Sequence, residues 1–312
     1  IFMKRKFNFY LLLLITQIFR KKSLYLFAAC AICFISCNKD TAIGGGTGGG
    51  GTSSLAERRI IDTAYGTDAH QKIDIYLPAG RTAATKVIFT IHGGGWEEGD
   101  KSSISDIDSM LHNKWPEAAI VNVNYRLTSN ASVHHTEIMG DITTVVNLIK
   151  NNKAGFVVSD TFFMLGQSAG AHLAMLYTYG FNTGGNIKAV SDFYGPANMR
   201  DWAWYNAVFF WNGKTVKDLL TRYNNTPWDT AVYDSHSPYA LVTAATKPTI
   251  VFHGTIDPVV PIYQSQWLHS RLNTFAVPNE YYEYFLDGHG FNYTNNADAV
   301  NKTVTFFKLH TQ

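Results

Sequence analysis

The sequence predicts an α/β fold in which a mostly parallel sheet is covered by helices on both faces. Short apolar runs alternate with longer runs of helical periodicity along most of the 312 residues. Continuous apolar runs of strand length are typical of strands that are buried on both faces. Hydrophobic residues make up 46% of the chain and charged residues 16%, which excludes a disordered protein.

These runs give the order of the elements. Two opening strands are expected, the second of which alternates apolar Ile73, Ile75 and Leu77 with polar residues. The strands are expected at 60–65, 72–77, 87–91, 118–124, 161–166, 189–194, 249–253 and 281–285. The helices are expected at 104–114, 137–150, 169–179, 264–273 and 297–310. In such a fold, functional side chains gather where the parallel strands end.

The first residues have the composition of a targeting segment. Residues 1–36 contain six basic residues and no acidic one, and each of their two apolar runs is shorter than a membrane-spanning helix. The second run ends in Ser36 and Cys37, which is the layout of a signal peptide. Because residues 34–37 resemble a bacterial lipobox, we predict a leader over 1–36 and lipidation at Cys37. The expected location is the bacterial cell envelope, at the outer membrane or cell surface, with a secreted or periplasmic form and an uncleaved anchor as alternatives.

A Gly-rich stretch follows and separates the leader from the globular part. Residues 37–54 are predicted to form a flexible tether, and residues 55–312 to form the catalytic domain. All 24 acidic residues but only 20 of the 26 basic residues lie after residue 36, so a nucleic-acid-binding surface is not expected. The three cysteines lie within the first 37 residues, so the domain has neither a disulfide nor a cysteine nucleophile.

A G-x-S-x-G string stands at Gly166–Gly170, between the strand expected at 161–166 and an alanine-rich helix. In the nucleophile elbow, the glycines allow a strained strand-to-helix turn that exposes the serine hydroxyl. We therefore predict Ser168 as a nucleophile. The alternative is an ordinary turn in which the serine caps the helix.

A glycine run, His92–Trp96, follows the strand expected at 87–91. Ester hydrolysis passes through an oxyanion that requires preorganised N–H donors, and glycine lets the backbone approach a substrate closely. We predict that the N–H groups of Gly93, Gly94 and Ala169 form the oxyanion hole. The alternative for the run is a simple glycine turn.

A serine nucleophile needs a base and an acid that orients it. His289 follows the last expected strand, and Asp257 follows the strand before it. Ser168, Asp257 and His289 occur in the Ser–Asp–His order of the α/β-hydrolases. Asp287 is the rival acid, but it lies only two residues before His289 on the same short loop. This chemistry requires no metal and no cofactor.

Six motifs together resemble the α/β-hydrolase esterase/lipase superfamily, and in particular the bacterial carboxylesterases that include feruloyl and acetyl-xylan esterases. They are HGGGW at 92–96, NYRL at 124–127, GQSAGAHLA at 166–174, SP at 237–238, HGTIDPVVP at 253–261 and DGHGF at 287–291. The resemblance implies the α/β-hydrolase fold, and a serine carboxylesterase acting on short-acyl or aromatic esters, including polysaccharide-linked acetate or ferulate. An amidase or formamidase of the same fold is the alternative, and a non-catalytic binding module is a third hypothesis.

The stretch 198–237 departs from the strand–helix rhythm and is dense in aromatic residues. We predict a small cap whose flat side chains contact substrate. The alternative is a hydrophobic cluster beneath a long insertion. The residues assigned to substrate binding are Trp96, Gln167, Tyr194 and Trp202. The expected partners are a small-molecule or polysaccharide ester and, through the lipid, a membrane; the oligomeric state is left open.

Two further expectations concern residues without a catalytic role. His134 and His135, beside Glu137, are interpreted as solvated loop histidines rather than metal ligands. Arg126 and Asp141 are expected to pair and brace the sheet, as the resemblance implies.

Overall fold

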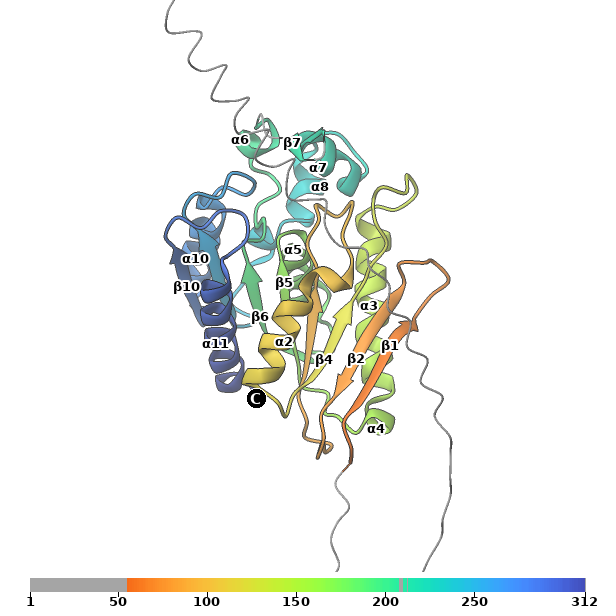
Figure 1. Ribbon diagram of the computed structural model, residues 1–312. Coiled ribbons are helices and arrows are strands. Elements are labelled where there is room, and N and C mark those ends of the chain that lie inside the picture. Colours follow the sequence, from red (N-terminus) through yellow and green to blue (C-terminus); the bar gives the residue numbers. More distant parts are fainter. Residues whose placement is uncertain (1–54, 208–209, 212, 312) are drawn as a thin grey trace, which may run out of the picture. The chain divides into compact units, whose positions relative to one another are not determined.

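A computed structural model describes residues 55–207, 210–211 and 213–311 (Figure 1). The predicted leader, Cys37 and the predicted tether lie outside these described residues. Within the described ranges, no helix is long and apolar enough to cross a membrane.

The core of the domain is an eight-stranded sheet. Across the sheet the order is β1 (Arg58–Ala64), β2 (Lys72–Leu77), β4 (Ala119–Val123), β3 (Val87–Ile91), β5 (Phe162–Gln167), β6 (Ile187–Phe193), β9 (Thr249–Gly254) and β10 (Asn279–Tyr284). β2 runs antiparallel to both of its neighbours, and the strands from β4 to β10 are parallel. The predicted α/β class, with its mostly parallel sheet, is therefore confirmed.

Helices cover both faces of this sheet because the strand side chains are apolar on both sides. In β3, Ile88 packs with α2 (Ser105–Lys114) and α11 (Tyr293–Leu309). The next residue, Phe89, packs on the opposite face. The helices on that face are α3 (His135–Asn151), α5 (Ala169–Leu176) and α10 (Tyr263–Thr274). The turn η1 (Lys101–Ile104) precedes α2, and the short α4 (Lys153–Phe156) follows α3.

The predicted cap lies between β6 and β9, above the carboxyl ends of the strands (Figure 1). It contains α6 (Trp202–Tyr205), β7 (Phe210–Trp211), β8 (Lys214–Thr215), α7 (Val216–Asn224) and α8 (Thr230–Ser235), and α9 (Pro238–Leu241) follows it. Side chains of Asp201, Thr215 and Asp229 accept hydrogen bonds from the first backbone N–H groups of α6, α7 and α8. Such N-caps satisfy free N–H groups of the first turn and so stabilise the start of these short helices.

Several boundaries differ from the expected ones. The helix after Ser168 is α-helical only to Leu176 and continues as a π-helical turn over Tyr177–Phe181. The last helix begins at Tyr293 because the side chain of Asn292 caps it, and the last strand ends at Tyr284. β2 and β3 have the predicted bounds.

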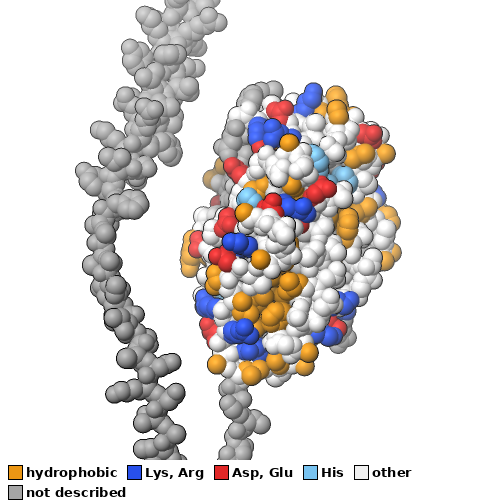
Figure 2. Space-filling model, turned by 90° about the vertical axis from the view of Figure 1, so that its right-hand side faces the viewer, with side chains coloured by type: hydrophobic (Ala, Val, Ile, Leu, Met, Phe, Trp, Pro, Cys, Tyr) orange, Lys and Arg blue, Asp and Glu red, His pale blue; other side chains and the backbone are white. Residues whose placement is uncertain are grey.

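The expected brace between Arg126 and Asp141 is present. The guanidinium contacts both carboxylate oxygens, and its Nη2 also donates to Glu137 O. Figure 2, which views the side where β1 and α3 lie, shows basic and acidic side chains interspersed on that face. Among the described residues, that face shows no broad basic patch of the kind that binds nucleic acid.

Candidate active site

Ser168 occupies a strained turn between β5 and α5. Its φ of 52° lies in the left-handed region, which places the side chain above the end of the sheet. Glycines on either side make the turn possible. A Cβ on Gly166 would lie 2.3 Å from the carbonyl carbon of Gly170, and one on Gly170 would lie 2.2 Å from Ile91 O. The local sequence thus forms the predicted elbow because only glycine fits at these two positions.

The structure brings the three predicted triad residues into one chain of hydrogen bonds. Ser168 Oγ lies 2.8 Å from His289 Nε2, and His289 Nδ1 lies 2.8 Å from Asp257 Oδ2. Since a carboxylate only accepts, Nδ1 carries the hydrogen, and Nε2 can accept the serine proton. The expected contacts are present, and the catalytic roles themselves stay predictions.

Asp257 is held as a carboxylate. Burial alone would raise its pKa, but hydrogen bonds from His253 and His289 keep the pKa well below the usual range. The other oxygen, Oδ1, accepts hydrogen bonds from Val259 N at 2.8 Å and Val260 N at 3.0 Å. These contacts fix the carboxylate in both charge and orientation.

The rival acid, Asp287, has other partners. Asn292 Nδ2 donates to one of its oxygens at 2.9 Å, and Asn295 Nδ2 donates to the other at 2.7 Å. Asp287 therefore braces the start of α11, and the acid next to His289 Nδ1 is Asp257.

The predicted oxyanion loop packs directly against the elbow. A Cβ on Gly93 would lie 3.1 Å from Ser168 Cβ, and a Cβ on Gly94, where φ is +116°, would lie 2.1 Å from Glu98 O. Ala169 is the first residue of α5, so its N–H has no acceptor within the helix. Gly93 and Ala169 thus lie beside the nucleophile, and Gly94 is the next residue of the same loop; the donor role of the three N–H groups stays a prediction.

Two neighbours hold this loop in place. His92 is buried, which lowers its pKa to about 4, so the ring is neutral; it stacks on Tyr125 with centroids 4.5 Å apart. Glu97 forms ion pairs with Lys214 and, at 3.3 Å, with Arg222. Because both cations belong to the cap segment, these pairs tie the oxyanion loop to the cap.

A small apolar cavity of about 40 Å³ lies over Ser168 and His289. Trp96 forms part of its wall, as predicted, and Val259 and Val260 contribute from the loop after Asp257. The remaining lining residues come from the oxyanion loop, the elbow, the segment after β6 and the cap: Gly95, Ala169, Pro196, Trp204, Val216, Leu219 and Leu220. The cap thus closes one side of the site with hydrophobic side chains.

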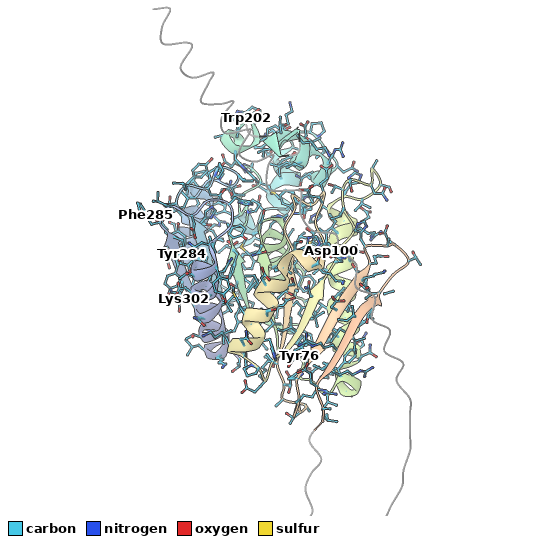
Figure 3. All side chains as sticks on the ribbon, in the orientation of Figure 1. Tyr76, Asp100, Trp202, Tyr284, Phe285 and Lys302 are labelled. Atoms are coloured by element: carbon cyan, nitrogen blue, oxygen red, sulfur yellow. The ribbon has the colours of Figure 1, made fainter. Side chains whose placement is uncertain are left out.

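Trp202, which was predicted to contact substrate, does not line this cavity. It is 58% exposed and packs against Tyr205 and Trp228 on the outside of the cap (Figure 3). Residues two positions apart in a helical turn point in nearly opposite directions. Trp204 therefore faces inward, lines the cavity and donates from Nε1 to Val259 O at 2.8 Å.

Tyr194 and Gln167 also lie outside the cavity lining. The ring of Tyr194 meets the His289 ring edge to face, with centroids 5.0 Å apart, and the Gln167 side chain hydrogen-bonds to Tyr194. Their assignment to substrate binding is therefore not supported: Tyr194 contacts the imidazole of His289, and Gln167 contacts Tyr194.

One expectation about the histidines is wrong. His135 is buried rather than solvated, because its Nδ1 lies 2.8 Å from Tyr223 Oη and its ring stacks on His236. His172 Nε2 lies 2.8 Å from His236 O. These three rings anchor the cap to α3 and α5.

Sequence reasoning also missed His253, which contacts Asp257. The only sequence signal for this contact was that His253 lies four residues before the acid.

The model of the BD-FAE family matches residues 73–272, which is well over half of the chain. The chain belongs to the BD-FAE family. This is an α/β-hydrolase esterase family, so the predicted superfamily is confirmed.

Individual curated relatives share only about a quarter of their residues with the chain over the matched regions. Esterase LipC of Mycobacterium tuberculosis is 24% identical over 261 residues, which cover 77% of this chain and 61% of LipC. The probable isoprenylcysteine α-carbonyl methylesterase ICMEL1 of Arabidopsis thaliana is 27% identical over 39% of this chain, and the match spans only 24% of its length. A truncated carbohydrate esterase from gut microbiota shares the fold with a TM-score of 0.66 at 20% identity, covering 83% of this chain and 99% of that one.

Proposed function

We propose that this chain is a serine carboxylesterase that hydrolyses short-acyl esters through an acyl-enzyme on Ser168. The observation that carries the proposal is the unbroken chain of hydrogen bonds from Ser168 through His289 to Asp257, at the base of an apolar cavity. Membership of an esterase family supports an ester, rather than an amide, as the bond that is cleaved.

In the first half of the reaction, Ser168 Oγ attacks the ester carbonyl and its proton passes to His289 Nε2. The carbonyl oxygen becomes an oxyanion, which the N–H groups of Gly93, Gly94 and Ala169 would stabilise. When the intermediate collapses, the C–O bond to the alcohol breaks and His289 gives its proton to the departing alkoxide. Asp257 stabilises the imidazolium between these two steps.

In the second half, water takes the place of the alcohol. His289 accepts a proton from the water as it attacks the acyl carbon, and the same donors hold the second oxyanion. Collapse breaks the bond to Ser168 Oγ, which recovers the proton from His289 and releases the carboxylic acid. The buried, permanently ionised Asp257 serves both halves without changing its own protonation state.

The cavity supports a small acyl group. A volume of about 40 Å³ with apolar walls has room for only a few heavy atoms, on the order of an acetyl group. A polymeric alcohol does not fit a cavity of this size, so we place the acyl group inside and the alcohol on the open side. Polysaccharide-linked acetate fits this arrangement, whereas the larger ring of a feruloyl group would have to lie outside the cavity.

We propose that the alcohol part of the natural ester is a sugar. The carbohydrate esterase that shares this fold and the exposed indole of Trp202 on the cap both favour a sugar. An envelope location suits such a substrate, and we propose a lipid anchor at Cys37 on the lipobox-like residues 34–37. Labelling of cells with radioactive palmitate tests the anchor: the label should be present in the wild type and lost in Cys37→Ala.

The activity is tested with 4-nitrophenyl acetate, butanoate and octanoate, and with a formyl anilide for the amidase alternative, beside Ser168→Ala. The proposal expects hydrolysis that falls with acyl length and is lost in Ser168→Ala. Hydrolysis of the anilide alone would favour the amidase, and a folded wild type without activity would favour the binding module.

A further inference from the structure

His253, near the end of β9, is fully buried beside the catalytic acid and has no part in the steps above. Its Nε2 lies 2.9 Å from Val260 O and 3.1 Å from Asp257 Oδ2. Both of these atoms are acceptors, so Nε2 must carry a hydrogen. Its Nδ1 lies 2.7 Å from Ser265 Oγ on α10, which holds the ring from the other side.

The contact with Asp257 involves the oxygen that matters for catalysis. Oδ1 is occupied by the N–H groups of Val259 and Val260, whereas Oδ2 faces His289 Nδ1 at 2.8 Å and His253 Nε2 at 3.1 Å. One carboxylate oxygen therefore serves two imidazoles. A donor on Oδ2 reduces the negative charge that this oxygen presents to His289.

We propose that His253 is a positioning residue that sets, through Asp257 Oδ2, how strongly His289 holds the proton it takes from Ser168. The inference rests on the function proposed above. With His253 in place, the acid stabilises the imidazolium enough to form it, yet leaves the proton available for the departing alcohol. Without His253, Oδ2 would interact with His289 alone, and the base would remain protonated to higher pH.

Other ionisable groups also face His253 and must be separated from it. Asp192 on the neighbouring strand β6 is buried, which raises its pKa to about 7, and the nearby His253 acts in the opposite direction on this pKa. Glu283 on β10 lies opposite His253 in the sheet register, and its carboxylate accepts hydrogen bonds from Gln266 and Tyr281. Since Asp192 titrates near neutrality, Asp192→Asn is the control that removes its contribution.

The test compares His253→Leu, which lacks a donor, with His253→Gln, which keeps a side-chain N–H. In the full chain, kcat/KM for 4-nitrophenyl acetate is followed between about pH 5 and pH 9, with and without Asp192→Asn. For His253→Leu we expect kcat to fall on the order of tenfold with little change in KM. The midpoint on the acid side should rise by on the order of 0.5 pH unit. His253→Gln should keep the wild-type midpoint.

A second readout and a milder variant keep the test decisive. NMR titration of the His289 imidazole in the Ser168→Ala background reports the shift caused by His253→Leu without turnover, so this readout holds even if the chain proves not to be an esterase. If His253→Leu does not fold, Ser265→Ala, which removes only the Nδ1 partner, should give a smaller rise in the same direction. An unchanged midpoint in the folded variants would overturn the proposal and leave His253 as a brace of the 257–260 loop.

Discussion

Truncation of Leu219 should change which esters the enzyme prefers. Leu219 lies on α7, lines the cavity, and has its Cδ1 3.5 Å from a Cβ built on Gly95 of the oxyanion loop. Leu219→Ala removes three carbons from the wall of a cavity of about 40 Å³. Butanoate has two more methylenes than acetate, and each buried methylene is worth about 0.8 kcal/mol. Full acceptance of the longer tail is therefore worth about 1.6 kcal/mol, or about 15-fold in kcat/KM.

The assay is the ratio of kcat/KM for 4-nitrophenyl butanoate to that for the acetate. In Leu219→Ala this ratio should rise toward about 15 times its wild-type value. Leu309→Ala is the matched control, because it makes the same chemical change at an exposed position on α11. An unchanged ratio in Leu219→Ala, or an equal rise in Leu309→Ala, would refute the placement of the acyl group in this cavity.

Four other substitutions test three separate parts of the structure. Gly94→Ala places a Cβ against Glu98 O, so the oxyanion loop must move and kcat should fall about 10²–10³-fold; wild-type kcat would contradict the assigned donor. In urea unfolding, Trp204→Ala should lower the free energy of unfolding by about 3–5 kcal/mol, whereas Trp202→Ala should change it by no more than about 0.5 kcal/mol. Equal losses would contradict the opposite orientations of the two side chains. Burial raises the pKa of Asp108 to about 7, so the wild type should lose stability as the pH rises from about 4 to about 7. Asp108→Asn avoids this loss, so its Tm advantage should be larger at about pH 8 than at about pH 5, and a pH-independent difference would exclude this titration.

The sheet and the triad could be predicted from the sequence because local constraints determine them. The alternation of Ile73, Ile75 and Leu77 defines β2, and an unbroken apolar run defines β3. Gly166 and Gly170 are required by the crowded elbow turn, so their spacing around Ser168, between an apolar strand and an alanine-rich helix, indicates a nucleophile.

The features that sequence reasoning missed depend on distant contacts. Which side of α6 faces the cavity is decided by Val259, which accepts the Trp204 hydrogen bond from a loop 55 residues away. His135 is buried because Tyr223 and His236, both in the cap segment, cover it. No local pattern specifies partners at such separations.

His253 was missed for a different reason. It lies on a buried strand, where an apolar residue is the rule, and it belongs to the same motif as Asp257. Its significance comes from the orientation of one ring nitrogen toward Oδ2, which a sequence does not specify.

The most direct test of the central claim is to identify the residue that becomes covalently modified. A diethyl 4-nitrophenyl phosphate probe reacts with an activated serine and leaves a stable phosphoryl adduct, which peptide mass mapping can locate. We expect one adduct, on Ser168, with inactivation in step with its formation and no adduct in His289→Ala. An adduct on another residue, or continued ester hydrolysis by a chain fully modified at Ser168, would contradict it.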